Sequence, residues 1–280
     1  MIKVALPNKG QLFEPTMDML AACGYKVSKS LRSLSTLDTE HQIEFYFLRP
    51  GDIPVYVSNG LLDAGITGKD FVAEKQVQPV HLLDLNYAHS KLCAAVPVEH
   101  AANKTVKDLK NSIIATSFVN ITKDYFGGHD KLVELEGAVE ISIKLGIADA
   151  IIDIVETGTT LKQAGLQIIG EPLFHSQAAL YAHPGRELQA EILVLKNRLA
   201  GKLLANAYMM VEYDCPATLL EIACKLTPGI ESPTVTPLQN KDWFSIKAMI
   251  PKKEAHKKLD ELAKLGCKGI LLTSIESARI

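Results

Sequence analysis

Short apolar runs and helix-like segments alternate through the first 200 residues of the chain. Strands are predicted where apolar residues follow one another in short runs, and helices where they recur at every third or fourth position. The predicted strands are 2–6, 43–48, 64–67, 92–96, 112–116, 150–155 and 178–182. The predicted helices are 12–23, 53–59, one beginning at 105–109, 140–145 and 188–204. This order favours an α/β architecture with mainly parallel sheets.

The pattern changes near the C-terminus. Strands are predicted at 207–213, 234–237, 243–250 and 269–275, with helices at 217–226 and 252–265. This βαββαβ order is the ferredoxin-like arrangement. By analogy of fold, a small domain of this type commonly serves regulation or assembly.

The chain length and two of the strands suggest how these elements divide into domains. At 280 residues, two or three domains are expected. We expect strand 92–96 to carry the chain into a second lobe and strand 178–182 to return it. The predicted domains are a first lobe of residues 1–92 with 178–205, a second lobe of residues 93–177, and a C-terminal domain of residues 206–280.

Composition and charge narrow the classes of function. The chain is 47% hydrophobic and 22% charged with a formal net charge of -2, which gives no support for nucleic-acid binding. It opens on a strand-like segment and not on a signal peptide, and no apolar run approaches the roughly 20 residues of a membrane span. The five cysteines are scattered, which is typical of core residues in a reduced, cytoplasmic protein. The eight histidines show no metal-ligand spacing, so no metal site held by the protein is predicted.

The segment from Asp153 to Lys162 carries the strongest chemical signal. A predicted strand ends in a Thr-Gly-Thr-Thr turn that opens a short helix, where hydroxyls and free N–H groups favour an anion. Asp153 and Glu156 precede that turn, and carboxylates accept hydrogen bonds from sugar hydroxyls. The combination favours a ligand with a phosphate and a diol, such as phosphoribosyl pyrophosphate (PRPP). The alternative is an ordinary turn with a threonine N-cap.

Further candidates follow three other predicted strands, where open α/β sheets bind ligands. Lys9 lies beside Gly10 after strand 2–6 and suits a pyrophosphate as a point charge, although a solvated loop lysine is the common case. Arg49 follows strand 43–48 and offers a fork for phosphate oxygens, or a salt bridge to Asp52 or Asp63. After strand 64–67, Lys69 and Asp70 are expected to point into the same region.

These segments resemble the ATP phosphoribosyltransferase family in its long form, in order along nearly the whole chain. The matching segments are 6–10, 47–53, 63–68, 137–140, 153–161 and 227–238. The resemblance implies a bilobed, periplasmic-binding-protein-like catalytic core of two mixed or parallel sheets, followed by the ferredoxin-like domain. It also implies a cytoplasmic pentosyltransferase that forms homo-oligomers, namely dimers and hexamers.

The implied reaction is the first step of histidine biosynthesis. N1 of ATP displaces pyrophosphate from C1 of PRPP and forms phosphoribosyl-ATP. Because N1 is unprotonated at neutral pH, the reaction needs positioning and charge stabilisation more than a strong base. Mg²⁺ is implied as a cofactor that PRPP itself brings.

The resemblance also assigns residues to the substrates. PRPP is assigned to Asp153 and to the turn of Glu156, Thr157, Gly158, Thr159, Thr160 and Leu161. Lys9 and Arg49 are assigned to the pyrophosphate as catalytic residues. The nucleotide and ribose are assigned to Arg32, Asp70 and Glu140, and a plain surface role for Arg32 is the alternative.

Feedback inhibition by L-histidine is implied for the C-terminal domain. The residues assigned to histidine are Asp214, Ile230, Thr234 and Gly269, with Asp214 pairing the amino group. The alternative for Asp214 is a helix N-cap before Cys215 and Pro216. Two other readings stay open from the residues alone: a bilobed small-molecule-binding protein without catalysis, and a PRPP-dependent transferase that acts on another base.

Overall fold

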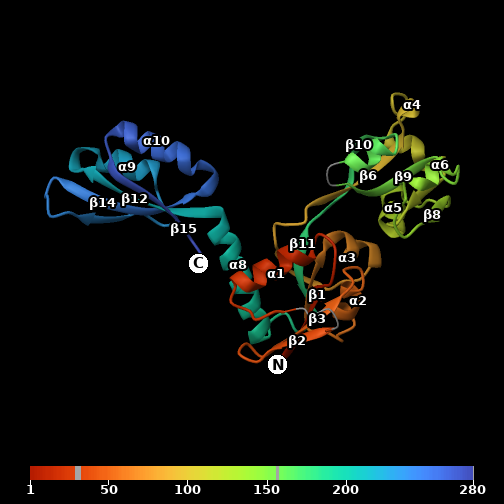
Figure 1. The fold of residues 1–280 in the computed structure, drawn as a ribbon, viewed down its shortest axis with the longest axis horizontal. Helices are drawn as coiled ribbons and strands as arrows, with labels where there is room; N and C mark the ends of the chain where they lie inside the picture. The colour runs from red at the N-terminus through yellow and green to blue at the C-terminus, as the bar shows by residue number, and fades with distance from the viewer. Residues whose placement is uncertain (29–32, 156–157, 280) are drawn as a thin grey trace. The chain divides into compact units, whose positions relative to one another are not determined.

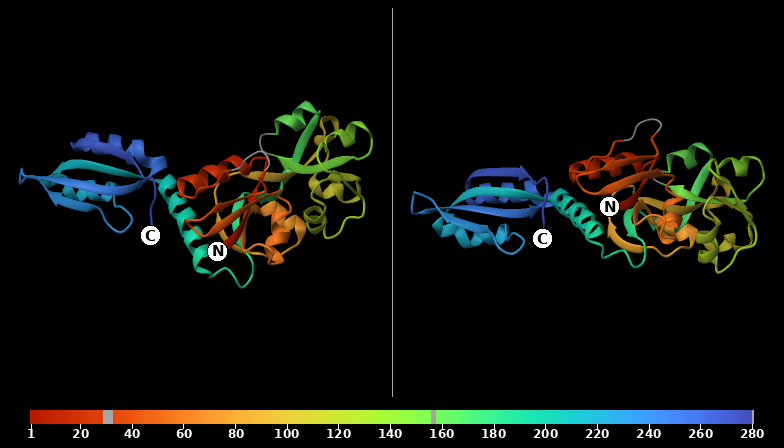
Figure 2. Two further views of the ribbon diagram at one scale, coloured as in Figure 1. Left: turned by 60° about the horizontal axis from the view of Figure 1, so that its bottom comes forward. Right: turned by 90° about the horizontal axis from the view of Figure 1, so that it is seen from below.

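The computed structural model describes residues 1–28, 33–155 and 158–279. The candidate residues Arg32, Glu156 and Thr157 lie outside the described residues. The chain divides into two compact units, one of residues 1–21 and 25–196 and the other of residues 22–24 and 197–280. Their ribbons are drawn in Figure 1 and in two further views in Figure 2.

The first unit contains a six-stranded sheet. We call this sheet and its three helices the first lobe; the helices are α1 (Phe13–Ala22), α2 (Ile53–Ser58) and α3 (Lys69–Lys75). The strand order is β2-β3-β1-β4-β11-β5. β1 runs parallel to β3 and β4, and the other pairings are antiparallel. The strands are β1 (Ile2–Pro7), β2 (Ser35–Asp38), β3 (Ile43–Leu48), β4 (Ala64–Gly68), β5 (Val80–Asp84) and β11 (Ala178–Ala182).

A five-stranded sheet and its helices form the second lobe of the same unit. The strand order is β10-β6-β9-β7-β8, and β7 runs parallel to β8 and β9. The strands are β6 (Ser90–Pro97), β7 (Ile114–Thr116), β8 (Leu132–Glu134), β9 (Ala150–Val155) and β10 (Leu166–Ser176). The helices are α4 (Val98–Ala101), the 3₁₀ turn η1 (Val106–Asn111), α5 (Val119–Phe126), α6 (Ile141–Lys144) and α7 (Thr159–Gln163).

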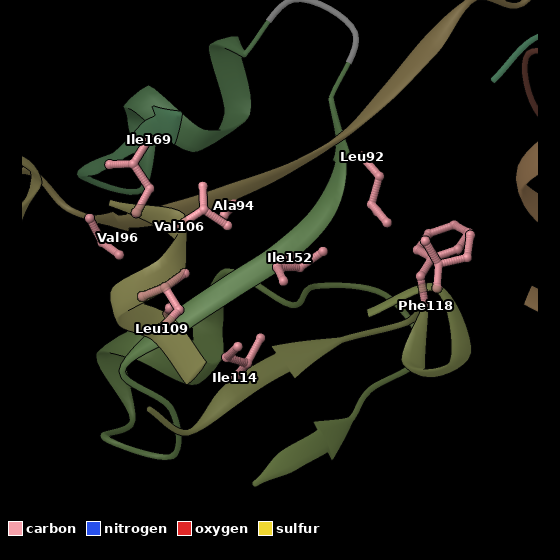
Figure 3. Packing of buried hydrophobic residues seen from close by; sticks show 11 residues of the cluster. Leu92, Ala94, Val96, Val106, Leu109, Ile114, Phe118, Ile152 and Ile169 are labelled. Carbon is pink, nitrogen blue, oxygen red and sulfur yellow. The ribbon is translucent and has the colours of Figure 1, made fainter. Parts of the chain in front are cut away.

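Apolar side chains cover both faces of the second sheet. On one face, Leu92, Ala94 and Val96 of β6 pack with Ile152 of β9 and with residues of η1 and α5 (Figure 3). On the other face, the intervening residues of β6 and β9 pack against Leu161 of α7. Burial on both faces explains why these strands are continuous apolar runs in the sequence.

Both large sheets are mixed, which confirms the mixed sheets that the resemblance implies, whereas the order of elements alone favours mainly parallel ones and is wrong in this respect. β6 pairs antiparallel with both β9 and β10, and β11 pairs antiparallel with both β4 and β5. β6, β10 and β11 flank the two passages of the chain between the lobes. Parallel neighbouring strands require a connection, usually a helix, that returns the chain to the same end of the sheet. These three strands are instead joined by segments that cross between the lobes, and this sets their antiparallel direction.

The second unit confirms the predicted ferredoxin-like βαββαβ order. Its antiparallel sheet has the order β13-β14-β12-β15. The strands are β12 (Tyr208–Pro216), β13 (Thr234–Pro237), β14 (Trp243–Pro251) and β15 (Lys268–Ser274). The helices are α9 (Leu220–Leu226) and α10 (Ala255–Leu265), preceded by the short turns η2 (Ala217–Leu219) and η3 (Lys252–Glu254). Helix α8 (Ala190–Ala207) leads into this sheet.

Among the residues that the structure describes, no helix has the length and apolarity needed to cross a membrane.

A buried tyrosine of the sheet forms hydrogen bonds with helix α9 in the second unit. Tyr213 of β12 is 1% exposed. Its hydroxyl lies 2.7 Å from Oγ1 of Thr227 and donates to the carbonyl of Ala223 at 3.1 Å. Burial raises the pKa of Tyr213 to about 12, so the phenol stays protonated as a donor.

We expect Tyr213→Phe to lower the stability of this unit by about 1 kcal/mol, because a buried hydrogen bond is lost while the ring still fills its place. Trp243 of β14 is the only tryptophan of the chain, so its fluorescence during urea unfolding reports on this unit. Tyr208→Phe, in the same strand, is the control. Equal unfolding midpoints for Tyr213→Phe and the wild type would contradict the prediction.

Candidate active site

The loops after β1, β3 and β4 meet at one cavity of about 240 Å³, which we call the lysine cavity. Because these three strands run parallel, their carboxyl ends lie at the same edge of the sheet. The first lobe contributes Lys9, Pro50 and Asp70, and the second lobe contributes Phe118 and Ile154. Arg49 is exposed beside Pro50 and is not among the residues that line the cavity.

Asp70 is a buried carboxylate held by a residue far away in sequence. Asp70 is only 5% exposed. The hydroxyl Oγ of Ser176 donates a hydrogen bond to Oδ1 of Asp70 at 2.5 Å. The backbone N–H of Asp70 donates in turn to Oγ of Ser176 at 3.1 Å. Burial raises the pKa of Asp70, and the bond from Ser176 partly opposes this effect. A Cβ at position 68 would lie 2.1 Å from Oδ1 of Asp70, so only glycine fits before this carboxylate.

The expectation that Lys69 points into the same region as Asp70 is wrong. Nζ of Lys69 lies 2.8 Å from the Asp84 carboxylate, which also accepts hydrogen bonds from His81 and Gln177. Among the described residues, Arg49 forms no salt bridge to Asp52 or Asp63, and Asp63 pairs with Arg186 at 2.5 Å.

The end of β9 and the start of α7 border a second cavity of about 310 Å³, which we call the acidic cavity. It brings together five of the residues predicted from the sequence: Glu140, Asp153, Gly158, Thr160 and Leu161. Gly158 has a φ of 72°, a left-handed conformation that favours glycine, and it caps α7. Leu161, the third residue of α7, is buried in the core and holds this helix against the sheet.

Two carboxylates, Asp153 and Glu140, set the electrostatics of the acidic cavity. Oδ1 of Asp153 accepts a hydrogen bond from the Ile154 N–H at 2.8 Å. Burial raises the pKa of Asp153; the Ile154 bond lowers it, and the negative charge of Glu140 raises it further. Two neighbouring carboxylates of this kind suit hydroxyl donors or a cation, while the exposed Thr159 and Thr160 suit an anion at the other end.

The two cavities share Ile154, the fifth residue of β9. One therefore adjoins the other at the carboxyl end of this strand. The arrangement offers a lysine with a buried carboxylate on one side, and a carboxylate pair with a phosphate-type turn on the other. Within the described ranges, no three histidine, cysteine, aspartate or glutamate side chains are grouped so that they could hold a metal ion.

Sequence reasoning missed Ser176, Phe118 and Ile154 as site residues. Ser176 is 106 positions from Asp70, and nothing in the local sequence connects them. Phe118 and Ile154 are apolar residues that sequence patterns assign to the core. Only their position at the ends of β7 and β9 marks them.

The residues assigned to histidine are only partly brought together in the second unit. Asp214 lies on β12, between the buried Tyr213 and Cys215, so its side chain is on the sheet face opposite the helices. A Cβ at Gly269 would lie 3.4 Å from Oδ2 of Asp214, so these two residues are adjacent. Thr234 is on β13, which β14 separates from β12, and Ile230 is 42% exposed in the loop before it. The N-cap alternative for Asp214 is wrong, because β12 continues to Pro216, which caps η2.

Comparison with known proteins links this geometry to a family. A family model described as ATP phosphoribosyltransferase matches residues 49–201, and one described as "HisG, C-terminal domain" matches residues 205–277. The ATP phosphoribosyltransferase of Arthrobacter sp. (strain FB24) is 45% identical over 288 residues, and that of Streptomyces coelicolor is 40% identical over 287 residues. In both cases all of this chain and all of the relative are covered.

A solved structure agrees with these relatives. A chain of the "ATP phosphoribosyl transferase (HisG:HisZ) complex from Thermotoga maritima" superposes with a TM-score of 0.62 and 28% sequence identity. The match covers 71% of this chain and 97% of that chain. Family models over both units and full-length relatives thus lead to one conclusion: the chain belongs to the ATP phosphoribosyltransferase family.

Proposed function

We propose that this protein transfers the phosphoribosyl group of PRPP to N1 of ATP, giving phosphoribosyl-ATP and pyrophosphate in the first step of L-histidine biosynthesis. The observation that carries the proposal is the acidic cavity, where Asp153 and Glu140 face the Gly158–Leu161 turn. This arrangement suits a ligand with hydroxyls at one end and a phosphate at the other, as PRPP has. Membership in the family supplies ATP as the acceptor. Both substrates are cytoplasmic metabolites, so we place the reaction in the cytoplasm.

In the proposed complex, the 5-phosphate of PRPP binds at the start of α7 and at the residues that precede it. Gly158, Thr159, Thr160 and the backbone at Leu161 provide donors there, and Glu156 and Thr157 belong to the same proposed site. Asp153 accepts hydrogen bonds from the ribose hydroxyls, with Glu140 beside it. The raised pKa of Asp153 is compatible with this role, because both forms of the carboxyl group accept hydrogen bonds.

ATP is proposed to approach from the lysine cavity. The N1 lone pair attacks C1 of the ribose, and the electron pair of the breaking C1–O bond leaves with pyrophosphate. Lys9 and Arg49 stabilise the negative charge that develops on the leaving group. Asp70 and Arg32 are proposed to contact the nucleotide. No strong base is required, since the attacking nitrogen carries no proton.

Mg²⁺ is the proposed cofactor. The donors on the protein that fit this ion are the carboxylate oxygens of Asp153 and Glu140, because Mg²⁺ prefers oxygen ligands. They are too few to form a coordination shell, so PRPP oxygens and waters would supply the remaining ligands. When bound, the ion would supply positive charge to offset the negative charge that develops on the leaving group.

The C-terminal domain is proposed to bind histidine and to inhibit the enzyme. Asp214 would pair with the amino group of the inhibitor, with Gly269 next to it and with Thr234 and Ile230 on the rim. Because Thr234 and Ile230 are exposed, a second copy of the chain could complete this site in a homo-oligomer such as a dimer or hexamer.

The proposed reaction is tested by incubating the protein with ATP, PRPP and Mg²⁺ and following the ultraviolet absorbance of phosphoribosyl-ATP. Pyrophosphatase removes the other product and draws the reaction forward. Product from ATP supports the proposal, and product from another base in place of ATP would favour a different transferase. A folded protein that forms no product with any base would favour the binding-protein alternative.

We expect Thr160→Val to weaken PRPP binding about fivefold, because one hydroxyl donor to the phosphate is lost. Thr39→Val, in an exposed turn of the first lobe, is the control. The dissociation constant is measured by calorimetry. Equal affinities for PRPP would exclude the hydroxyl of Thr160 from the phosphate site.

Lys9→Met should reduce kcat/KM by about 10- to 100-fold while the melting temperature changes little, since a charge-assisted hydrogen bond to the leaving group is lost from an exposed residue. Lys107→Met removes an equivalent exposed charge from η1 and serves as the control. Kinetics of Lys9→Met like those of the wild type would make Lys9 a surface residue without a catalytic role.

Asp214→Asn should raise the histidine concentration for half inhibition at least tenfold and leave uninhibited turnover within a factor of two, because a charged partner of the amino group is removed. Asp242→Asn, in the turn before β14, is the matched control. Inhibition curves that coincide for the two variants would place the histidine site elsewhere.

A further inference from the structure

Helix α3 of the first lobe contacts the second lobe along its length, and Ala73 packs against the apolar core of that lobe. Asp70 is bonded to Ser176 of β10, as described above. The ring of Phe71 lies 6.3 Å from the ring of Phe118, measured between centroids. One turn further along α3, Glu74 reaches the start of α5.

The carboxylate of Glu74 caps helix α5. Oε1 accepts from the N–H of Asn120 at 3.0 Å, and Oε2 accepts from the N–H groups of Asn120 and Ile121 at 3.1 Å each. In return, Nδ2 of Asn120 donates to the backbone carbonyl of Glu74 at 2.8 Å. These amides are the second and third of the helix Val119–Phe126, and such groups have no acceptor within their own helix.

The cap has to come from outside α5, because its own N-cap residue cannot supply one. That residue is Phe118, whose side chain makes no capping hydrogen bond. A glutamate from the other lobe takes the place that serine, threonine, asparagine or aspartate normally fills. The negative charge also faces the positive end of the helix dipole.

This contact adjoins the lysine cavity. Asp70, Phe71 and Phe118 all line that cavity, and they connect Glu74 to it along α3 and α5. A free helix start beside the cavity would attract a substrate phosphate. The Glu74 carboxylate already occupies the start of α5. Substrate anions are therefore expected to bind Lys9 and the start of α7, and not the start of α5.

We propose that Glu74 is a positioning residue that holds the two lobes together so that the lysine cavity and the acidic cavity adjoin. This inference rests on the proposed function, in which PRPP and ATP meet across these cavities. Without Glu74 the lobes separate more often, and PRPP must bind to a smaller fraction of closed molecules. The apparent affinity then falls in proportion to that fraction, whereas turnover of the closed complex is unchanged.

The contact itself is tested without substrate. Hydrogen exchange of the full chain is followed by mass spectrometry for the segment 118–126 in the wild type, Glu74→Gln and Glu74→Ala. We expect exchange of the Asn120 and Ile121 amides to rise at least fivefold in Glu74→Ala and less in Glu74→Gln, which keeps one acceptor oxygen. Glu99→Gln, on the exposed face of α4, is the control and should exchange like the wild type. Unchanged protection in Glu74→Ala would overturn the proposal.

The positioning role is tested by separating affinity from turnover. Glu74→Gln should raise the PRPP dissociation constant from calorimetry, and the KM for PRPP, about five- to tenfold, with kcat within a factor of two. Asn120→Ala removes only the neutral bond to the Glu74 carbonyl and should change the affinity less than twofold. Lost protection with unchanged PRPP affinity, or a fall confined to kcat, would overturn the role.

Two measurements keep these outcomes distinct. Thermal melting shows whether each variant is folded. If Glu74→Ala is unfolded, the exchange and affinity measurements on Glu74→Gln decide the proposal. A wild type that forms no phosphoribosyl-ATP would refute the proposed function, whereas the exchange and calorimetry experiments would still decide the role of Glu74.

Discussion

The chain passes between its two large sheets twice, and this constraint determines where the candidate site forms. β5 leads into β6 on the way out, and β10 leads into β11 on the way back. β11 then lies between β4 and β5 and pairs antiparallel with both. Because β10 ends immediately before this return, Ser176 reaches the start of α3 and bonds to Asp70. The mixed sheets and the buried carboxylate of the lysine cavity follow from the same crossing.

Three carboxylates near these cavities are partly desolvated and are each stabilised by at least one hydrogen-bond donor. Burial raises the pKa values of Asp70, Glu74 and Asp153, since desolvation disfavours the charged form. Each keeps at least one hydrogen-bond donor: Ser176 for Asp70, the α5 amides for Glu74 and the Ile154 N–H for Asp153. Partly desolvated groups of this kind interact more strongly with ligands than exposed groups do. With a net charge of -2 over the chain, binding of polyanions has to depend on local cations such as Lys9.

In the C-terminal sheet, the alternation of side chains along a strand separates core residues from residues on the opposite face. On β12, the odd-numbered residues Val211, Tyr213 and Cys215 form the core with α9 and α10. The intervening residues, Asp214 among them, face away from the helices. A change on that face leaves the core contacts in place, which suits a surface that responds to a ligand or to another copy of the chain.

The sequence by itself determined the central strands, the βαββαβ order and the turn after β9, because their signals are local. Strand burial follows from apolar runs, and the Gly158 turn follows from the backbone freedom of glycine. Its patterns did not reveal β2, β5, β8 and β10, which are the edge strands of the two large sheets and are less completely buried than the central ones. Only the tertiary structure decided that Lys69 pairs with Asp84, that Ser176 holds Asp70 and that Glu74 caps α5. These contacts join residues that are 15, 106 and 46 positions apart, so they depend on how strands pair and lobes meet, which no local pattern encodes.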